Sequence, residues 1–143
     1  MKPIILLVDD EAMLREVMGD VLVKDGFVCV PCANGPDALR LIDAGPYKFD
    51  LLLSDVKMPG TVDGFEVAKR FKAKYPEGTV ILISGYLDEK AAASLSKDRV
   101  RVLPKPLRAQ ELLDAVKEAL TLASILSEGS KVTPLDPNSP RRP

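Results

Sequence analysis

Short apolar runs alternate with amphipathic stretches along this chain. The β-branched, apolar runs predict strands at residues 4–8, 27–32, 51–54, 80–84 and 100–103. The stretches between and after these runs carry apolar side chains at helical spacing, or the capping and turn residues that bound a helix. The sequence therefore predicts a regular alternation of strand and helix, repeated five times.

Five helices are expected from this pattern. Residues 65–75 and 112–123 each place their apolar side chains on one face, and a shorter helix begins after Asn34 and ends at Gly45. The apolar residues on one face of the first helix are Met13, Leu14, Val17, Met18, Val21 and Leu22. A weakly patterned, alanine-rich helix is expected around residues 88–95.

The alternation predicts an α/β fold with a parallel sheet and helices on both faces. The third and fourth runs are apolar throughout, as central strands are, whereas the second run contains Pro31, and proline is tolerated in a sheet mainly at an edge. We therefore expect a flavodoxin-like, doubly wound, five-stranded sheet with strand order 2-1-3-4-5. In such a fold, ligands bind beyond the carboxyl ends of the strands, at the switch point between the first and third.

Composition narrows the classes of function. The chain has 143 residues, enough for one domain, and its 20 basic and 21 acidic residues give no field that attracts nucleic acid or an anionic membrane. The first apolar run is too short for a signal peptide or a membrane span, so we expect a cytoplasmic protein. The chain contains no histidine, which excludes Ser-His-Asp and Cys-His nucleophile sites and histidine-ligated zinc.

Two local features complete the organisation. Cys29 and Cys32 form a C-x-x-C pair, but three residues of extended strand separate them by about 10 Å, so we interpret them as small hydrophobic residues. From residue 128 the sequence EGSKVTPLDPNSPRRP is rich in proline and has no periodicity. We expect one domain over residues 1–127 and a disordered tail over 128–143.

Residues that could form a functional site lie at, or just after, the ends of four of the five predicted strands. They are Asp9, Asp10, Asp55, Ser84, Gly85 and Lys105. Three clustered carboxylates would repel by about 4 kcal/mol per pair at 4 Å and an effective dielectric of 20. Mg²⁺ prefers such oxygen ligands and, together with Lys105, would balance their charge. A carboxylate in this setting can act as a nucleophile toward phosphorus, and Asp55 is the candidate.

At this point the chain resembles the receiver domains of two-component response regulators, over residues 2–126. The resemblance rests on VDDE at 8–11, LLLSDVKMPGTVDG at 51–64, ILISGY at 81–86 and LPKPL at 103–107. It implies a regulator in phosphorelay signal transduction. Such a protein takes a phosphoryl group from a histidine kinase or histidine phosphotransfer protein and switches a surface that binds a downstream protein target.

The resemblance also implies a metal site. Asp55 would be the phosphoacceptor and Asp10 the direct Mg²⁺ ligand of the acidic pair, with Asp9 binding the ion through water. The backbone carbonyl of Lys57 would complete the protein ligands. We therefore expect a magnesium-binding phosphoprotein whose only catalysis is its own slow phosphorylation and dephosphorylation.

The switch is implied in the same way, with one departure from the family pattern. Ser84 would move its hydroxyl onto a phosphoryl oxygen, Lys105 would form an ion pair with the new charge, and the Lys105-Pro106 bond would be cis. Many receivers carry an aromatic residue three positions before this lysine, but here it is Val102. The responding surface would comprise the fourth helix, the fifth strand and the fifth helix.

Three residues at the mouth of the site are expected to modulate the phosphoryl group. Lys57 and Tyr86 would tune how long the acyl phosphate survives attack by water. Gly85, which lies between Ser84 and Tyr86, would leave room for a phosphodonor to approach.

Simpler explanations exist for the individual residues. Asp9 and Asp10 could cap the first helix, Ser84 could be an ordinary strand-end hydroxyl, and Lys105 could be a solvated lysine. At the level of the whole chain, one alternative is a phosphatase or phosphotransferase acting on small substrates. Others are a docking module with little phosphate turnover and a receiver excised from a hybrid histidine kinase. The protein would be a monomer or a phosphorylation-dependent dimer.

Overall fold

The computed structural model describes residues 2–85 and 99–131. Its elements, in chain order, are β1 (Ile4–Val8), α1 (Ala12–Lys24), β2 (Val28–Cys32), α2 (Gly35–Ala44), β3 (Leu51–Asp55), α3 (Gly64–Lys74), β4 (Thr79–Ser84), β5 (Val100–Pro104) and α5 (Ala109–Lys131). Every predicted strand is present, and each end lies within one residue of its predicted position. The helix expected around residues 88–95 lies outside the described residues. None of the described helices is long and apolar enough to cross a membrane.

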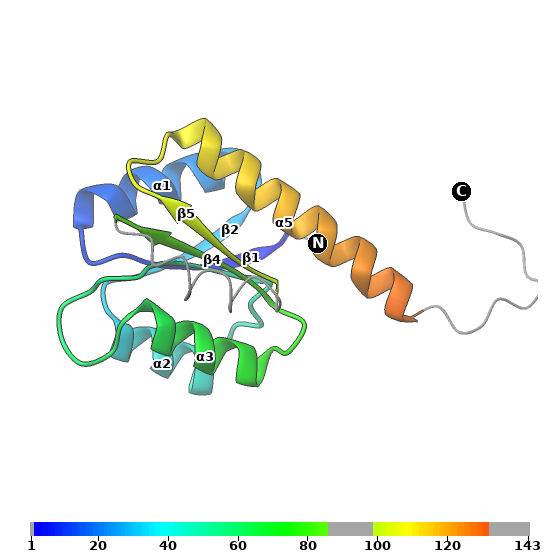
Figure 1. Cartoon of the computed structure of the whole chain (residues 1–143), viewed down its shortest axis with the longest axis horizontal. Helices are drawn as coiled ribbons and strands as arrows, with labels where there is room; N and C mark the ends of the chain where they lie inside the picture. Colours follow the sequence, from blue (N-terminus) through cyan, green and yellow to red (C-terminus); the bar gives the residue numbers. More distant parts are fainter. Residues whose placement is uncertain (1, 86–98, 132–143) are drawn as a thin grey trace, which may run out of the picture.

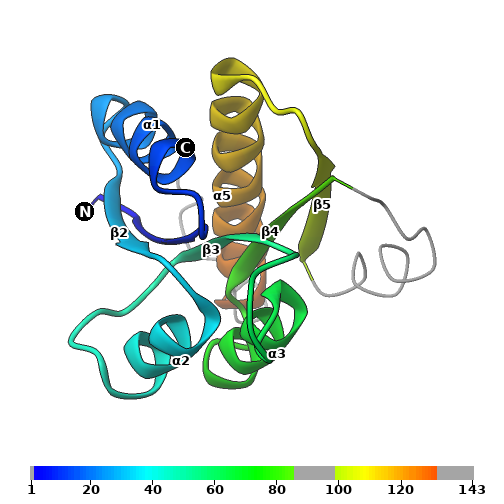
Figure 2. The same ribbon diagram turned by 90° about the vertical axis from the view of Figure 1, so that its left-hand side faces the viewer.

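The five strands form one parallel sheet in the order β2-β1-β3-β4-β5, as predicted. Helices α1 and α5 cover one face of the sheet, and α2 and α3 cover the other (Figures 1 and 2). Alternate residues of each central strand enter the two cores. Leu6 and Leu52 pack toward α2 and α3, while Ile5 and Leu51 pack toward α1 and α5.

Strand β2 lies at the edge of the sheet, where Pro31 predicts it. The backbone N–H of Val28 donates to the carbonyl of Pro3 at 2.9 Å, and the carbonyl of Cys32 accepts from the N–H of Asp9 at 3.1 Å. Even-numbered residues of β2 therefore turn their polar backbone atoms toward β1. Pro31 is odd-numbered, so its nitrogen faces the open edge and the missing N–H costs the sheet no hydrogen bond.

The two cysteines lie on opposite faces of the sheet. Cys32 belongs to the core beneath α2 and α3, whereas Cys29 packs against the core beneath α1 and α5. Both are free thiols, and burial raises the pKa of Cys29 to about 11. The structure thus confirms that they act as small hydrophobic residues.

The periodic face of α1 is only partly buried, which the spacing of its apolar residues does not reveal. Leu22 is buried, but the exposed fractions of Met13, Leu14 and Val17 are 80%, 39% and 55%. The first half of α1 therefore presents an apolar surface beside the carboxyl ends of the strands. We call Met13, Leu14 and Val17 the α1 apolar surface.

Helix α5 ends at Lys131, four residues beyond the expected boundary at residue 127. The loss of apolar periodicity at residue 128 does not stop the helix, because each further residue still adds a backbone hydrogen bond. The first proline beyond α5 is Pro134. Residues 132–143 of the expected tail lie outside the described residues.

Candidate functional site

Three carboxylates meet at the carboxyl ends of β1 and β3, which are neighbours in the sheet. Asp9 and Asp10 directly follow β1, and Asp55 is the last residue of β3. Carboxylate oxygens of the three residues lie within 4.8 Å of one another. Asp9 and Asp55 are 1% and 5% exposed, whereas Asp10 is exposed, so the cluster opens toward solvent on the Asp10 side.

Three hydrogen bonds of Asp9 hold the turn that follows β1. Its N–H donates to Cys32, its Oδ1 accepts the N–H of Glu11 at 2.8 Å, and its carbonyl accepts Nη1 of Arg15 at 2.7 Å. Burial raises the pKa of Asp9, the hydrogen bond from Glu11 opposes that rise, and the charge of Asp55 adds to it. The N-cap residue of α1 is Glu11, and its side chain forms no capping hydrogen bond. Neither Asp9 nor Asp10 occupies the N-cap position, so helix capping alone does not explain the two aspartates.

Lys105 reaches the same cluster from the residue that follows β5. Its Nζ donates to Oδ2 of Asp55 at 3.0 Å, and only 29% of the lysine side chain is exposed. Burial by itself lowers the pKa of this ammonium, but the hydrogen bond and charge of Asp55, with the charges of Asp9 and Glu11, outweigh it and raise the pKa. Lys105 is therefore a member of the site and not a solvated loop lysine.

Ser84 and Gly85 lie at the end of β4, which neighbours β3. Ser84 is buried, and its carbonyl accepts the backbone N–H of Lys105 at 2.8 Å, which ties the ends of β4 and β5 together. The Lys105-Pro106 bond is cis, as the resemblance implies. A Cβ on Gly85 would meet no atom within 4 Å, so this residue leaves open space. Tyr86 lies outside the described residues.

The loop between β3 and α3 brings Gly64 close against the backbone of Asp55 and Val56. The N–H of Gly64 donates to the carbonyl of Val56 at 2.8 Å, and a Cβ on Gly64 would lie only 2.2 Å from the backbone oxygen of Asp55. Only glycine permits this close approach. Lys57 is exposed at the start of the loop, two residues beyond Asp55.

Two residues that contact the backbone of the carboxylate cluster, Gly64 and Arg15, were not among the site residues predicted from the sequence. The sequence did hold a signal for Gly64: Asp63 and Glu66 are spaced as an N-cap and the third helical residue, and the side chain of Asp63 accepts the N–H of Glu66 at 2.9 Å. That spacing makes Gly64 the first residue of α3, directly beside β3. No comparable motif marks Arg15.

Val102 lies on β5 opposite Leu82 of β4 and packs, half-buried, against the core beneath α2 and α3. It places a short, rigid side chain where many receivers carry a ring.

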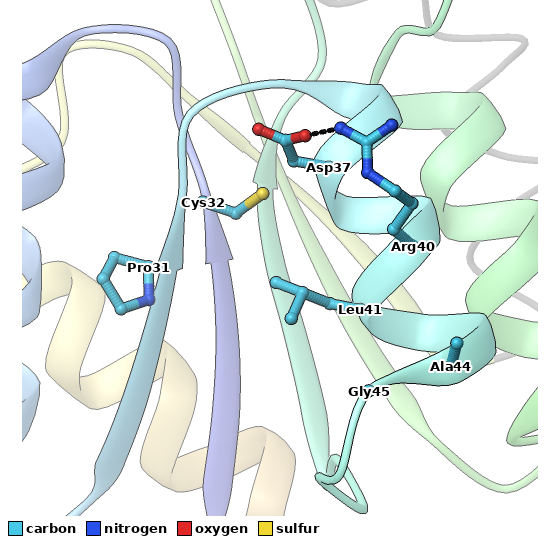
Figure 3. Close-up of a pocket in the computed structure, with 7 residues that line it drawn as sticks. All are labelled: Pro31, Cys32, Asp37, Arg40, Leu41, Ala44 and Gly45. Atoms are coloured by element: carbon cyan, nitrogen blue, oxygen red, sulfur yellow. Dashed lines mark ion pairs between the residues drawn. The ribbon is translucent and has the colours of Figure 1, made fainter.

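A groove elsewhere on the molecule contains none of the predicted site residues. It has a volume of about 390 Å³ and lies between β2 and α2 (Figure 3), lined by Pro31, Cys32, Asp37, Arg40, Leu41, Ala44 and Gly45. Its charged groups, Asp37 and Arg40, are paired with each other. The carboxylate cluster and Lys105 lie instead at the carboxyl ends of the strands.

The carboxylate cluster suits a hard divalent cation. Its donors are oxygens, the ligands that Mg²⁺ prefers. Three carboxylates face one described ammonium, that of Lys105, which leaves two negative charges, the amount that Mg²⁺ neutralises. Asp9, Asp10 and Asp55 could therefore hold Mg²⁺ at the open side of the cluster.

Comparisons with known proteins agree with this geometry. A family model, the response regulator receiver domain, matches residues 5–117. The chain is 38% identical over 118 residues to the positive alginate biosynthesis regulatory protein of Pseudomonas aeruginosa, and the match covers 80% of this chain and 46% of that protein. It is 34% identical over 121 residues to sporulation initiation phosphotransferase F of Bacillus subtilis, covering 84% and 95% of the two chains.

A solved structure shows the same fold. The crystal structure of a response regulator receiver protein from Sinorhizobium medicae matches with a TM-score of 0.77 and 27% identity, covering 85% of this chain and 97% of that one. The chain thus spans nearly all of two relatives but less than half the length of the alginate regulator.

Proposed function

Because the chain belongs to the response regulator receiver domain family, we propose that Asp55 accepts a phosphoryl group from a phosphohistidine on a partner protein. One observation carries the proposal. The Asp55 carboxylate is buried between two further carboxylates and an ammonium, with Lys105 Nζ at 3.0 Å. This charge arrangement suits a cation and a phosphoryl group and has no evident structural purpose.

Asp55 supplies the nucleophile of the transfer. A carboxylate oxygen of Asp55 attacks phosphorus, a P–O bond forms, the P–N bond to the histidine breaks, and its electron pair stays on the imidazole nitrogen. Asp10 would bind Mg²⁺ directly, with Asp9 acting through water and the carbonyl of Lys57 as a further ligand. Bound there, Mg²⁺ offsets the negative charge of the transferring group. Lys105 and the Ser84 hydroxyl bind the remaining phosphoryl oxygens.

Loss of the phosphoryl group is slow hydrolysis at the same site. Water attacks phosphorus, the P–O bond to Asp55 breaks, and inorganic phosphate leaves. Lys57 is exposed at the mouth of the site, where its side chain can hinder or orient that water. Tyr86, whose structure is not described, is proposed to tune the same hydrolysis. The open space at Gly85 leaves room for the approaching phosphodonor.

The output is a change in the surface formed by β5 and α5. Phosphorylation replaces the Asp55 carboxylate by a larger and more negative group. The ammonium of Lys105 and the hydroxyl of Ser84 then shift to contact the phosphoryl oxygens. The hydrogen bond from the Lys105 N–H to the Ser84 carbonyl couples their movements directly. With Val102 in place of a ring, this backbone link transmits the signal to a downstream protein target.

The α1 apolar surface provides the place where the histidine-bearing partner docks. Met13, Leu14 and Val17 lie on the helix that starts two residues after Asp10, so they border the phosphorylation site. An exposed apolar patch beside a polar site is typical of a protein interface. This chain contains no histidine, so a phosphohistidine donor would have to dock from outside these residues.

Transfer from a phosphohistidine protein tests this function. A histidine phosphotransfer protein carrying labelled phosphate is mixed with the wild-type chain, with Asp55→Asn and with Asp20→Asn, a matched change of an exposed aspartate. We expect label on the wild type and Asp20→Asn but not on Asp55→Asn, and none when EDTA removes Mg²⁺. Equal labelling of Asp55→Asn would contradict the assignment. No labelling of any protein by several donors would favour the docking module.

A further inference from the structure

The carbonyl of the peptide between Asp9 and Asp10 accepts a hydrogen bond from a side chain in the first turn of α1. Arg15 of α1 donates from Nη1 to the carbonyl of Asp9 at 2.7 Å, a contact that is partly buried. We propose that Arg15 is a positioning residue that sets the Mg²⁺ affinity of the site by holding this peptide. The inference rests on the proposed function, because it takes the carboxylate cluster to be the Mg²⁺ site.

Asp10 depends on its backbone for its position. Within residues 2–85 and 99–131, its carboxylate forms no hydrogen bond and no ion pair. By contrast, Asp9 is held by the N–H of Glu11 and Asp55 by Lys105. Among the described residues, no side-chain contact holds the Asp10 carboxylate in the cluster, so its position follows the orientation of the preceding peptide.

That orientation has three fixed points, all at Asp9. The N–H belongs to the sheet through its bond to Cys32, and the side chain closes the turn onto Glu11. The carbonyl is the third point, and Arg15 is its donor in the described part of the chain. Asp9 is 1% exposed, so a carbonyl that lost Arg15 would rotate to find water. The Asp9–Asp10 peptide, and with it Asp10, would rotate too.

The guanidinium acts through this bond and not as a counter-charge to the cluster. No carboxylate of the described residues lies within 4.0 Å of Arg15 to form an ion pair. The contact of Arg15 with Asp9 is to the backbone carbonyl, so it leaves the carboxylate oxygens available to a cation.

Arg15 could act as a nearby charge or as a positioning residue, and the two roles predict opposite changes in Mg²⁺ affinity when Arg15 is removed. If it acted as a nearby positive charge, its removal would strengthen the binding of a cation. If it positions the peptide, its removal weakens binding, because outer-shell partners of metal ligands typically contribute tenfold or more in affinity. The variant Arg15→Lys keeps the positive charge and can still donate to the Asp9 carbonyl. The variant Arg15→Met keeps a long side chain but loses both the charge and the hydrogen-bond donor.

Calorimetric titration of the unphosphorylated protein with Mg²⁺ decides between them. We expect Arg15→Met to bind Mg²⁺ roughly tenfold more weakly than wild type and Arg15→Lys to bind with intermediate affinity. Arg40→Met, the control, removes a surface charge from α2 and should leave the affinity nearly unchanged. Thermal unfolding of each variant shows that it is folded at the temperature of the titration.

Affinity that is unchanged or higher in Arg15→Met, or higher in Arg15→Met than in Arg15→Lys, overturns the role of Arg15. The order of these two variants decides even if both are less stable than wild type. A wild-type protein that binds no Mg²⁺ overturns the metal site itself. Wild-type binding with the reverse order of variants overturns only the role of Arg15.

Discussion

Asp9 carries a carboxylate that is almost fully buried beside two others. In the metal-free protein its pKa is raised, mainly because burial disfavours the charged form. A group whose pKa is higher in the folded state contributes stability below its unfolded pKa and loses that contribution as the pH rises through the folded value. At neutral pH the charged Asp9 therefore destabilises the metal-free fold.

Asp9→Asn should stabilise the metal-free protein at neutral pH, because the amide keeps the acceptor for the Glu11 N–H and removes the buried charge. The gain should be absent below the ordinary Asp pKa of about 4 and grow as the pH rises. Urea unfolding of both proteins in EDTA between pH 4 and 7.5 measures this difference. A gain that is constant across the range would exclude titration of Asp9 as its cause.

Gly64 has a steric task that can be tested separately. Gly64→Ala places a Cβ 2.2 Å from the Asp55 oxygen, so β3 and α3 must separate, at a cost of about 2 kcal/mol of unfolding free energy. The matched control is Gly85→Ala, whose Cβ has open space and which should change stability by less than about 0.5 kcal/mol. Urea denaturation measures both. Equal effects would show that the approach of Gly64 to Asp55 is not needed.

At the scale of elements, α1 combines a structural half with a surface half. Its second half enters the core through Leu22, and Lys117 of α5 pairs with Asp25 just beyond its end at 3.1 Å. Its first half carries the α1 apolar surface next to the cluster. The two halves allow docking and folding to be separated by mutation.

Val17→Lys should slow phosphoryl transfer from a histidine phosphotransfer protein about tenfold, because it puts a charge into the docking interface. Transfer from acetyl phosphate, which needs no docking, should be unchanged. Val23→Lys is the matched control, since Val23 is 57% exposed on the same helix but at its far end. Equal slowing by both variants, or slowing with acetyl phosphate as well, would contradict docking on the α1 apolar surface.

At the scale of the whole molecule, the sequence predicts the sheet well because each strand is a dense apolar run bounded by polar residues. Pro31 then selects the edge strand, and the strand order brings the three aspartates together. Periodicity could not show that Met13 and Val17 are exposed, because it does not specify which neighbours cover a helix face. Nor could it find Arg15, whose bond to a backbone carbonyl depends on the path of a turn and leaves no pattern.

The chain contains residues for accepting a phosphoryl group but no histidine that could donate one. The chain provides the proposed acceptor Asp55, the carboxylates for the metal and the lysine that contacts the acceptor, but no imidazole that could carry the phosphoryl group. A phosphohistidine donor would therefore lie outside these 143 residues. Transfer from such a donor would require the proposed docking surface and the proposed acceptor to lie close together, and the α1 apolar surface does begin just after Asp10.

The most direct measurement locates the phosphoryl group on the chain. The protein is incubated with Mg²⁺ and acetyl phosphate and reduced with borohydride, which converts an aspartyl phosphate to homoserine, and its peptides are then sequenced by mass spectrometry. We expect homoserine at position 55 and aspartate at positions 9 and 10, with no conversion in EDTA. Homoserine at another aspartate, or none anywhere after incubation with Mg²⁺, would contradict it.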